Sequence, residues 1–148
     1  MKQKSVLSHF VEGERKWRVV DATNIPLGRL SSEIAKVMMG KHRPDFNRQI
    51  HDGDGVIVIN ASAVRINNAG KVYHWHTGYP GGIREEKATD RLERKPTSII
   101  YDAVKGMLPK NKLSRRVLKD LRVFAGSEHT HEAQKPEVWN LDHLRGDA

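Results

Sequence analysis

The feature that most restricts the fold is a run of four β-branched residues in the middle of the chain, Val-Ile-Val-Ile at 56–59. A run that is apolar at every position, rather than at every second one, is typical of a strand covered on both faces. A strand is also predicted at 17–22 (Trp-Arg-Val-Val-Asp-Ala) and a short one at 122–124. Together these strands indicate the interior of a small, largely parallel sheet.

Helical periodicity occupies several segments between these strands. A helix is predicted over 27–39, because apolar residues recur at helical spacing and Gly40 is placed to end it. Pro96 opens a second helix, whose inward residues are predicted to be Ile99, Ile100, Ala103, Val104 and Met107. A third helix begins near Asn111, a good N-cap, and runs to about Leu121.

Three further segments lie between the first and second of these helices. Residues 71–76 alternate well enough to form a strand, and the Gly- and Pro-rich stretch 77–82 is predicted to be a loop. Residues 85–94, whose acids and bases nearly balance, are predicted to form a solvated surface helix. Strands interleaved with helices indicate the α/β class.

We expect a single domain. The chain has 148 residues, without an internal repeat or a linker, and this length suits one hydrophobic core. The α/β domain is predicted over 15–126, between an N-terminal extension at 1–14 and a C-terminal tail at 127–148. The tail is polar, and we expect it to wrap the surface or to contact a neighbouring protein.

The composition excludes several classes of protein and points to a polyanionic partner. Lys and Arg outnumber Asp and Glu by 26 to 18, a formal net charge of +8. Cysteine is absent, which excludes disulfide scaffolds, thiolate metal sites and cysteine nucleophiles. No stretch approaches the ~18 apolar residues that span a bilayer, and no secretory signal is recognisable. We expect a cytoplasmic protein, without membrane association, that binds nucleic acid.

The positive charge is concentrated at 105–122, which holds seven basic residues and one acid, Asp120. On a helix, four of them fall within about a third of the turn: Lys112, Arg115, Arg116 and Lys119. A solvated face normally mixes both signs at a spacing of four residues, whereas here like charges face each other near a helix N-terminus. A bound phosphate would offset both penalties, so nucleic-acid contact is favoured over mere solvation.

Two other groups of residues suit RNA. One group lies on the outer face of the first predicted helix and in the segment directly after it, and it consists of Arg29, Lys36, Lys41, His42, Arg43 and Arg48. Taken alone, this group is equally consistent with a solvated surface. The other is the segment 71–84, where bases, aromatic rings and glycines suit base stacking and the approach of backbone amides to phosphates. We expect one of Tyr73 and Trp75 to be half-buried, and the glycines could equally serve turn geometry alone.

Patterns that suggest enzyme or metal chemistry are weak. Asp52 and Asp54 resemble the start of a calcium loop, but Val56 occupies the next ligand position and no Glu closes the loop. These carboxylates could hold Mg²⁺ in a nuclease, although a turn before the buried strand is favoured. The histidine pairs at 74/76 and 129/131 lack a third clustered zinc ligand. The usual nucleotide-binding and hydrolase motifs do not occur, so no catalytic residue, cofactor or metal is predicted.

One stretch carries a recognisable signature. It reads Val-Lys-Gly-Met-Leu-Pro-Lys-Asn-Lys-Leu-Ser-Arg at 104–115, followed by Leu-Arg-Val-Phe-Ala-Gly at 121–126. It closely resembles the signature of the large-subunit ribosomal protein L13 family, bacterial type. Other family landmarks stand in order within 15–140: Trp17 with Val-Val-Asp-Ala at 19–22, Leu-Gly-Arg-Leu at 27–30, Gly-Lys-His-Arg-Pro at 40–44, Asn-Ala at 60–61, Thr-Gly-Tyr-Pro-Gly-Gly at 77–82, His129 with His131, and Ala-Gln-x-Pro at 133–136.

The resemblance implies a three-layer α/β/α domain that binds 23S rRNA, acts early in subunit assembly and has protein neighbours within the subunit. Ten positions match motifs that we place on RNA: Lys41, His42, Arg43, Tyr79, Gly81, Gly82, Lys110, Asn111, Arg115 and Arg116. The chain departs from the family at three points. Residues 67–70 are shorter than the usual basic loop, which weakens the case for RNA contact there; Thr130 replaces the usual proline; and 143–148 extends beyond the usual end.

We therefore predict a structural constituent of the large ribosomal subunit that neutralises rRNA phosphates and needs neither a cofactor nor a small-molecule substrate. Two alternatives stay open: an extra-ribosomal regulator that binds messenger RNA and, less favoured, a metal-dependent nuclease. The predicted RNA-binding residues are Arg29, Lys36, Lys41, His42, Arg43, Arg48, Lys71, Tyr73, His76, Tyr79, Gly81, Gly82, Arg84, Lys105, Lys110, Asn111, Lys112, Arg115, Arg116, Lys119 and Arg122.

Overall fold

The computed structural model describes residues 15–44, 46–68 and 70–145, so the extension predicted at 1–14 lies outside the described residues. The body is built on a four-stranded sheet in the order β5-β2-β1-β6, with every neighbouring pair parallel. Its strands are β1 (Trp17–Asp21), β2 (Gly55–Ile59), β5 (Leu121–Val123) and β6 (Glu137–Val138). The predicted α/β class with a small parallel sheet is thereby confirmed.

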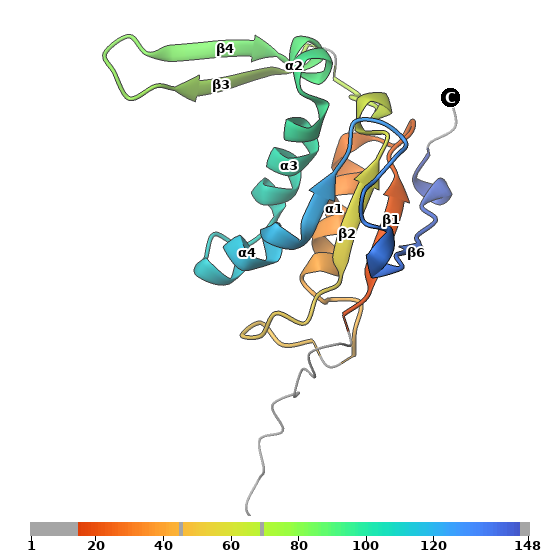
Figure 1. The fold of residues 1–148 in the computed structure, drawn as a ribbon. Coiled ribbons are helices and arrows are strands. Elements are labelled where there is room, and N and C mark those ends of the chain that lie inside the picture. The colour runs from red at the N-terminus through yellow and green to blue at the C-terminus, as the bar shows by residue number, and fades with distance from the viewer. Residues whose placement is uncertain (1–14, 45, 69, 146–148) are drawn as a thin grey trace, which may run out of the picture.

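Two helices cover one face of this sheet, α1 (Leu27–Met38) and α3 (Pro96–Met107), and they pack against each other. Figure 1 shows α1 directly behind β1 and β2. Leu30 and Ile34 of α1 and Val58 of β2 are each 0% exposed and belong to one hydrophobic core. Burial of a side chain of this size stabilises a fold by about 1.5–3 kcal/mol, so this layer holds the body rigid.

The opposite face of the sheet is covered by the chain that follows β5 (Figure 1). Ile57, whose side chain alternates with the residues that face α1, is fully buried there. Trp17 covers Gly55, where an added Cβ would lie 2.6 Å from the indole ring, and it stacks on His131 with 6.2 Å between ring centroids. In the described residues, the third layer implied by the family resemblance therefore consists of irregular chain and the short 3-10 helix η3 (Glu132–Gln134).

The segment predicted as a C-terminal tail packs along the sheet and supplies its fourth strand. β6 pairs with β1, and the Trp139 N–H donates a hydrogen bond to the Val19 carbonyl at 2.7 Å. Leu141 is 4% exposed and belongs to the core. A two-residue strand carries no alternating pattern, which is why the sequence did not predict it.

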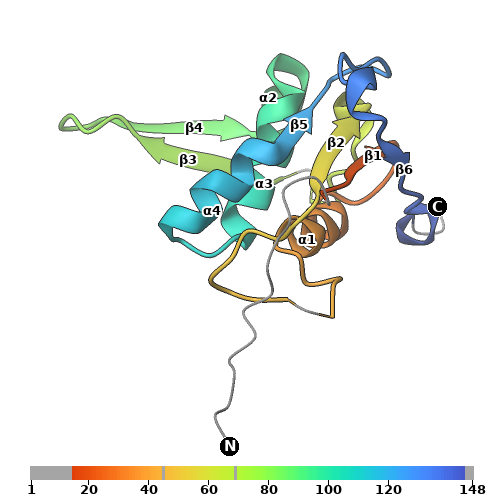
Figure 2. The same ribbon diagram turned by 60° about the horizontal axis from the view of Figure 1, so that its bottom comes forward.

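A two-stranded hairpin, β3 (Val72–His76) with β4 (Ile83–Lys87), extends away from the body in both views (Figures 1 and 2). The predicted strand at 71–76 is confirmed, but the predicted helix over 85–94 needs correction. Its first three residues belong to β4, and α2 covers only Ala88–Arg94. Antiparallel backbone pairing with β3 holds Glu85 to Lys87 extended, and the helix begins where Ala88 becomes buried.

The last helix is also shorter than predicted. α4 spans Lys112–Val117 and is followed by the 3-10 helix η2 (Leu118–Asp120), because the chain must turn into β5 at Leu121. The prediction that Met107 faces inward is wrong: its side chain lies at the end of α3, and the residue is 42% exposed. Two other short 3-10 helices are η1 (Ala61–Ala63) and η4 (Asp142–Leu144).

Candidate nucleic-acid interface

The α4 segment turns its basic side chains to solvent because its apolar residues are fixed on the other side. Asn111 caps the helix, its Oδ1 accepting a hydrogen bond from the Ser114 N–H at 2.7 Å. Val117 and Leu118 are buried in the core. Four exposed residues, which we call the 112–119 cations, face outward: Lys112, Arg115, Arg116 and Lys119. None of these four forms an ion pair with a carboxylate of the described residues.

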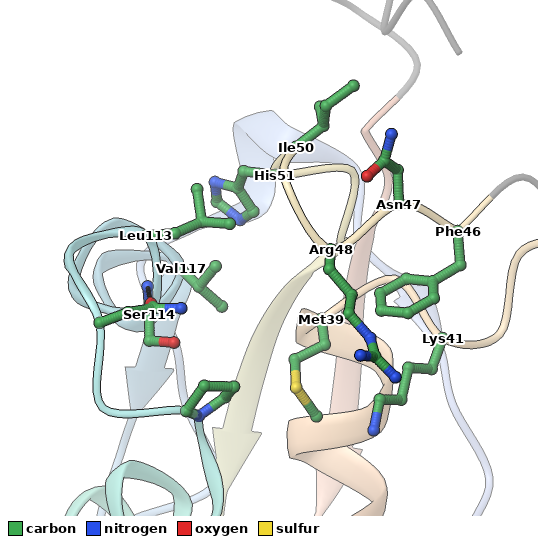
Figure 3. Close-up of a pocket in the computed structure, with 12 residues that line it drawn as sticks. Met39, Lys41, Phe46, Asn47, Arg48, Ile50, His51, Leu113, Ser114 and Val117 are labelled. Carbon is green, nitrogen blue, oxygen red and sulfur yellow. Dashed lines mark hydrogen bonds between the residues drawn. The ribbon is translucent and has the colours of Figure 1, made fainter. Parts of the chain in front are cut away.

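Two cavities flank the N-terminal turn of α4. The first, of about 420 Å³, lies between α4 and the loop after α1, and its lining includes Lys41 and Arg48 (Figure 3). The second has about 380 Å³, and its basic lining residues are Lys105, Lys110 and Arg115. Asn111 lines both cavities. Basic groups that are about 60 residues apart in the sequence therefore lie side by side.

A third hollow, of about 560 Å³, continues along α3 to the base of the hairpin. Its lining includes Arg29 and Lys71, and it shares Asp102 and Gly106 with the second cavity. Among the described residues, Asp102 is the one carboxylate that lines any of these three hollows, and it is ion-paired with Arg91. A continuous surface, which we call the basic belt, is thus lined by Arg29, Lys41, Arg48, Lys71, Lys105, Lys110 and Arg115.

The hairpin adds aromatic side chains to one end of the belt. Tyr73 is half-buried, with the Lys71 ammonium 4.9 Å and the Arg91 guanidinium 4.8 Å from its ring centroid. Trp75 is 46% exposed, so one of the two rings is half-buried, as predicted. Tyr79, in the loop, is 75% exposed. Exposed aromatic rings such as these two are the kind of surface on which unpaired bases stack.

The loop at the tip of the hairpin depends on its glycines for its shape. Gly81 has a φ of +69°, and a Cβ on Gly82 would lie 2.1 Å from Thr77 Oγ1. His76 Nδ1 accepts a hydrogen bond from the Gly78 N–H at 3.0 Å. Turn geometry therefore accounts for these residues, and an RNA contact by Gly81, Gly82 or His76 stays a prediction.

The structure turns two predicted residues, His42 and Arg43, toward a buried carboxylate that the sequence did not single out for this role. Asp54 is 1% exposed. The oxygens of its carboxylate lie 2.6 Å from Arg43 Nη2, 2.9 Å from Arg18 Nη2 and 3.0 Å from His42 Nε2. We call these four residues the Asp54 cluster. The only sequence signal for this cluster was an acid just before a buried strand with basic residues nearby, and no pattern in the sequence pointed to Arg18.

The electrostatics of the Asp54 cluster fix its charges. Burial raises the pKa of the Asp54 carboxyl, but the hydrogen bond and charge of Arg43, together with His42 and the charge of Arg18, outweigh it and hold that pKa below its usual range. Burial lowers the pKa of His42, and Arg18 and Arg43 lower it further against the opposing effect of Asp54. His42 is therefore neutral near pH 7, and it donates to Asp54 instead of supplying a free cation.

The geometry leaves no room for the metal chemistry considered from sequence. Asp54 is occupied by three basic side chains, and Asp52 is 5% exposed, so neither carboxylate is open to solvent. His74 lies 3.4 Å from Glu85, and His129 Nδ1 accepts the His131 N–H. Across 15–44, 46–68 and 70–145, no group of three or more His, Asp or Glu residues could hold a metal.

Three further predicted residues belong neither to the belt nor to the groups described above. Lys36 is exposed on α1 with Glu33 3.7 Å away. Arg84 is exposed on β4, and Arg122 is exposed on β5. No helix in the described ranges is long and apolar enough to cross a membrane.

Comparison with known proteins decides the family. A sequence model of the family described as Ribosomal protein L13 matches residues 15–130. The chain belongs to the ribosomal protein L13 family. The L13 relatives include large ribosomal subunit protein uL13 of Thermotoga petrophila, 49% identical over 94% of this chain and 95% of its own length, and that of Aquifex aeolicus, 53% identical over 85% and 90%. The same protein of Thermoanaerobacter sp. is 47% identical over 94% of this chain and 99% of its own length.

Membership of the L13 family confirms several predictions made from the sequence. The chain is a structural constituent of the large ribosomal subunit and is not an enzyme. It is located on the cytoplasmic ribosome. The nuclease alternative is thereby excluded, in agreement with the occupied carboxylate of Asp54.

Proposed function

We propose that this protein binds 23S rRNA through the basic belt and the 112–119 cations, and that it supports early assembly of the large subunit. The observation that carries the proposal is the pairing state of the charges. Among the described residues, the one carboxylate that lines the belt is Asp102, which is already neutralised by Arg91, and the 112–119 cations have no acidic partner there. A surface of one sign, without counter-charges of its own, favours a polyphosphate.

The body supplies the rigidity that such a protein needs. The belt runs along α3, which packs on α1 and the sheet, so its cations are held at fixed positions relative to one another. rRNA segments that contact opposite ends of the belt would be held in one relative arrangement. Contacts to phosphates fix position and carry little sequence information, so the protein is expected to recognise RNA shape and backbone.

Adjacent ribosomal proteins are the second proposed class of partner. Val72 is 37% exposed and Ile83 is 62% exposed, and cross-strand pairing places both on one face of the hairpin. Exposed apolar side chains on an element that leaves the body favour contact with protein. We assign this face of the hairpin to a neighbour within the subunit.

A salt titration tests the proposed RNA binding. If about six to eight phosphates are neutralised, the logarithm of the binding constant for 23S rRNA falls against the logarithm of salt concentration with a slope of about −4 to −7. Filter binding of a labelled transcript between about 50 and 200 mM salt measures this slope. Binding that does not depend on salt, or no retention of the transcript at low salt, would rule the proposal out.

A further inference from the structure

The first cavity beside α4 has a composition that phosphate binding does not explain. It holds about 420 Å³ and lies between α4 and the loop after α1. Its apolar lining residues include Met39, Phe46, Ile50, Leu113 and Val117. In Figure 3 the Phe46 ring lies on the loop side, across the cavity from the α4 side chains. A phosphate would gain nothing from such walls, whereas an aromatic ring would bury apolar surface against them.

The polar groups of the cavity are arranged at its edges. Lys41 and Arg48 lie on the same side as the Phe46 ring (Figure 3). Ser114 lies opposite, on α4, and Asn111 uses its Oδ1 for capping, which leaves its amide NH₂ as a donor without a hydrogen bond to another described residue. Cations, a stacking ring and a few hydrogen-bonding groups therefore surround one apolar space.

We infer that this cavity takes a single unpaired nucleobase of the rRNA, stacked on Phe46, with the phosphates of that nucleotide on Lys41 and Arg48. Unstacked bases in single-stranded RNA are recognised in this way, by an aromatic platform with hydrogen bonds to the base edge. The cavity is within the size range of small-ligand sites, and Asn111 connects it to the rest of the belt. The inference rests on the proposed rRNA binding and adds a base-specific contact to it.

Charge distinguishes a nucleobase from the side chain of a neighbouring protein. Among the described residues that line the cavity, the charged ones are Lys41 and Arg48, and none is a carboxylate. A nucleotide matches this, because its base is flat and apolar on both faces and its phosphate is an anion. An apolar protein side chain would fill the space but would leave the two cations without a partner.

The test compares Phe46→Ala with Phe46→Tyr in binding to the full 23S rRNA transcript. Loss of one base–aromatic stack costs about 1–3 kcal/mol, so Phe46→Ala is expected to weaken binding about 5- to 150-fold. The salt slope is expected to stay at the wild-type value, because no phosphate contact is removed. Phe46→Tyr keeps the ring and is expected to bind like the wild type.

A second variant guards against a folding defect. Leu113→Trp fills the cavity from α4, and it is expected to weaken binding without changing the slope; circular dichroism checks the fold of each variant. Chemical probing should find one base protected by the wild type and exposed with Phe46→Ala. If the wild type binds with the expected slope but both cavity variants bind equally well, the cavity assignment fails alone. If the wild type shows no salt-dependent binding, the proposed function itself fails.

Discussion

Two basic regions that look alike in the sequence behave differently in the fold. The triplet Lys41-His42-Arg43 and the 112–119 cations are both dense in positive charge, and both include residues that match motifs of the L13 family. In the structure, His42 and Arg43 bond to Asp54, with side chains 22% and 19% exposed. The 112–119 cations are exposed and have no acidic partner among the described residues. One region closes the fold and the other is open to a partner.

The difference shows that a run of basic residues does not by itself define a binding surface. What decides is whether a carboxylate from elsewhere in the chain is buried beside it. Along the chain, Asp54 is eleven residues from Arg43 and 36 residues from Arg18. The three side chains form one ion-pair network only after the strands pair. Lys41, the first residue of the triplet, instead lines the belt.

Removing the buried carboxylate gives the largest expected effect and separates the two regions most clearly. Asp54→Asn removes the buried charge that pairs with Arg18 and Arg43, both partly buried, and breaking such a pair costs about 3–5 kcal/mol. Urea unfolding is expected to show a loss of this size in the free energy of unfolding. A loss below about 1 kcal/mol would mean that the Asp54 cluster is not what closes this part of the fold.

Reversing the charge of two of the 112–119 cations should weaken RNA binding and leave the stability of the fold unchanged. Arg115→Glu with Arg116→Glu turns two attractions into repulsions, and 23S rRNA binding is expected to weaken on the order of 100-fold, about 3 kcal/mol. Because both side chains are exposed and without acidic partners among the described residues, the urea midpoint should stay near that of the wild type. Unfolding of this variant, instead of weaker binding, would show that the exposed face of α4 is misassigned.

Acid should affect the Asp54 cluster but not the 112–119 cations. Burial lowers the folded-state pKa of His42 below 6.5, so the unfolded chain binds more protons and stability falls as pH drops through 6.5. A second loss follows below about pH 3.8, because the folded pKa of Asp54 is depressed and the unfolded chain protonates first. Lys and Arg do not titrate between pH 5 and 8, so the rRNA affinity of folded protein should stay level there. Denaturant curves and filter binding at matched pH values distinguish the two responses.

The smallest effect concerns a residue that lines the belt without carrying charge. Gly106 lies in α3, and a Cβ there would meet nothing within 4 Å, so Gly106→Ala is expected to stabilise the helix by about 0.5–1 kcal/mol. Gly78 has a φ of +92°, and Gly78→Ala, the matched control, should destabilise the hairpin loop. A thermal melt measures both changes. Destabilisation by Gly106→Ala would show that this surface is more crowded than the structure describes.

Local patterns predicted the body of the fold well. The β-branched run became β2, and the apolar spacing of 27–39 and 96–107 became α1 and α3, because each element buries one continuous apolar face. The hairpin was only half predicted: β4 reads Ile-Arg-Glu-Glu-Lys, which suits a helix, and only pairing with β3 makes it a strand. β4 lacks a buried face, so its sequence has no alternation of apolar and polar residues from which a strand could be predicted.

The site was predictable in its charges but not in its geometry. Exposure of the 112–119 cations followed from helical periodicity, since Val117 on the other side had to be buried. The approach of the loop containing Arg48 to α4, and the closure of Asp54 on Arg18, depend on contacts between distant segments. Periodicity describes neighbours along one element, so it carries no information on such contacts.

The most direct test of the difference between the two regions is the salt dependence of 23S rRNA binding in two variants. If Arg115 and Arg116 neutralise phosphates and Arg43 neutralises Asp54, then Arg115→Ala with Arg116→Ala should reduce the magnitude of the log–log slope by about 1.4–1.8. Arg43→Ala, measured below its unfolding temperature, should keep the wild-type slope while losing stability. An unchanged slope in the double variant, with a reduced one in Arg43→Ala, would assign the phosphate contacts to the wrong region and contradict the account.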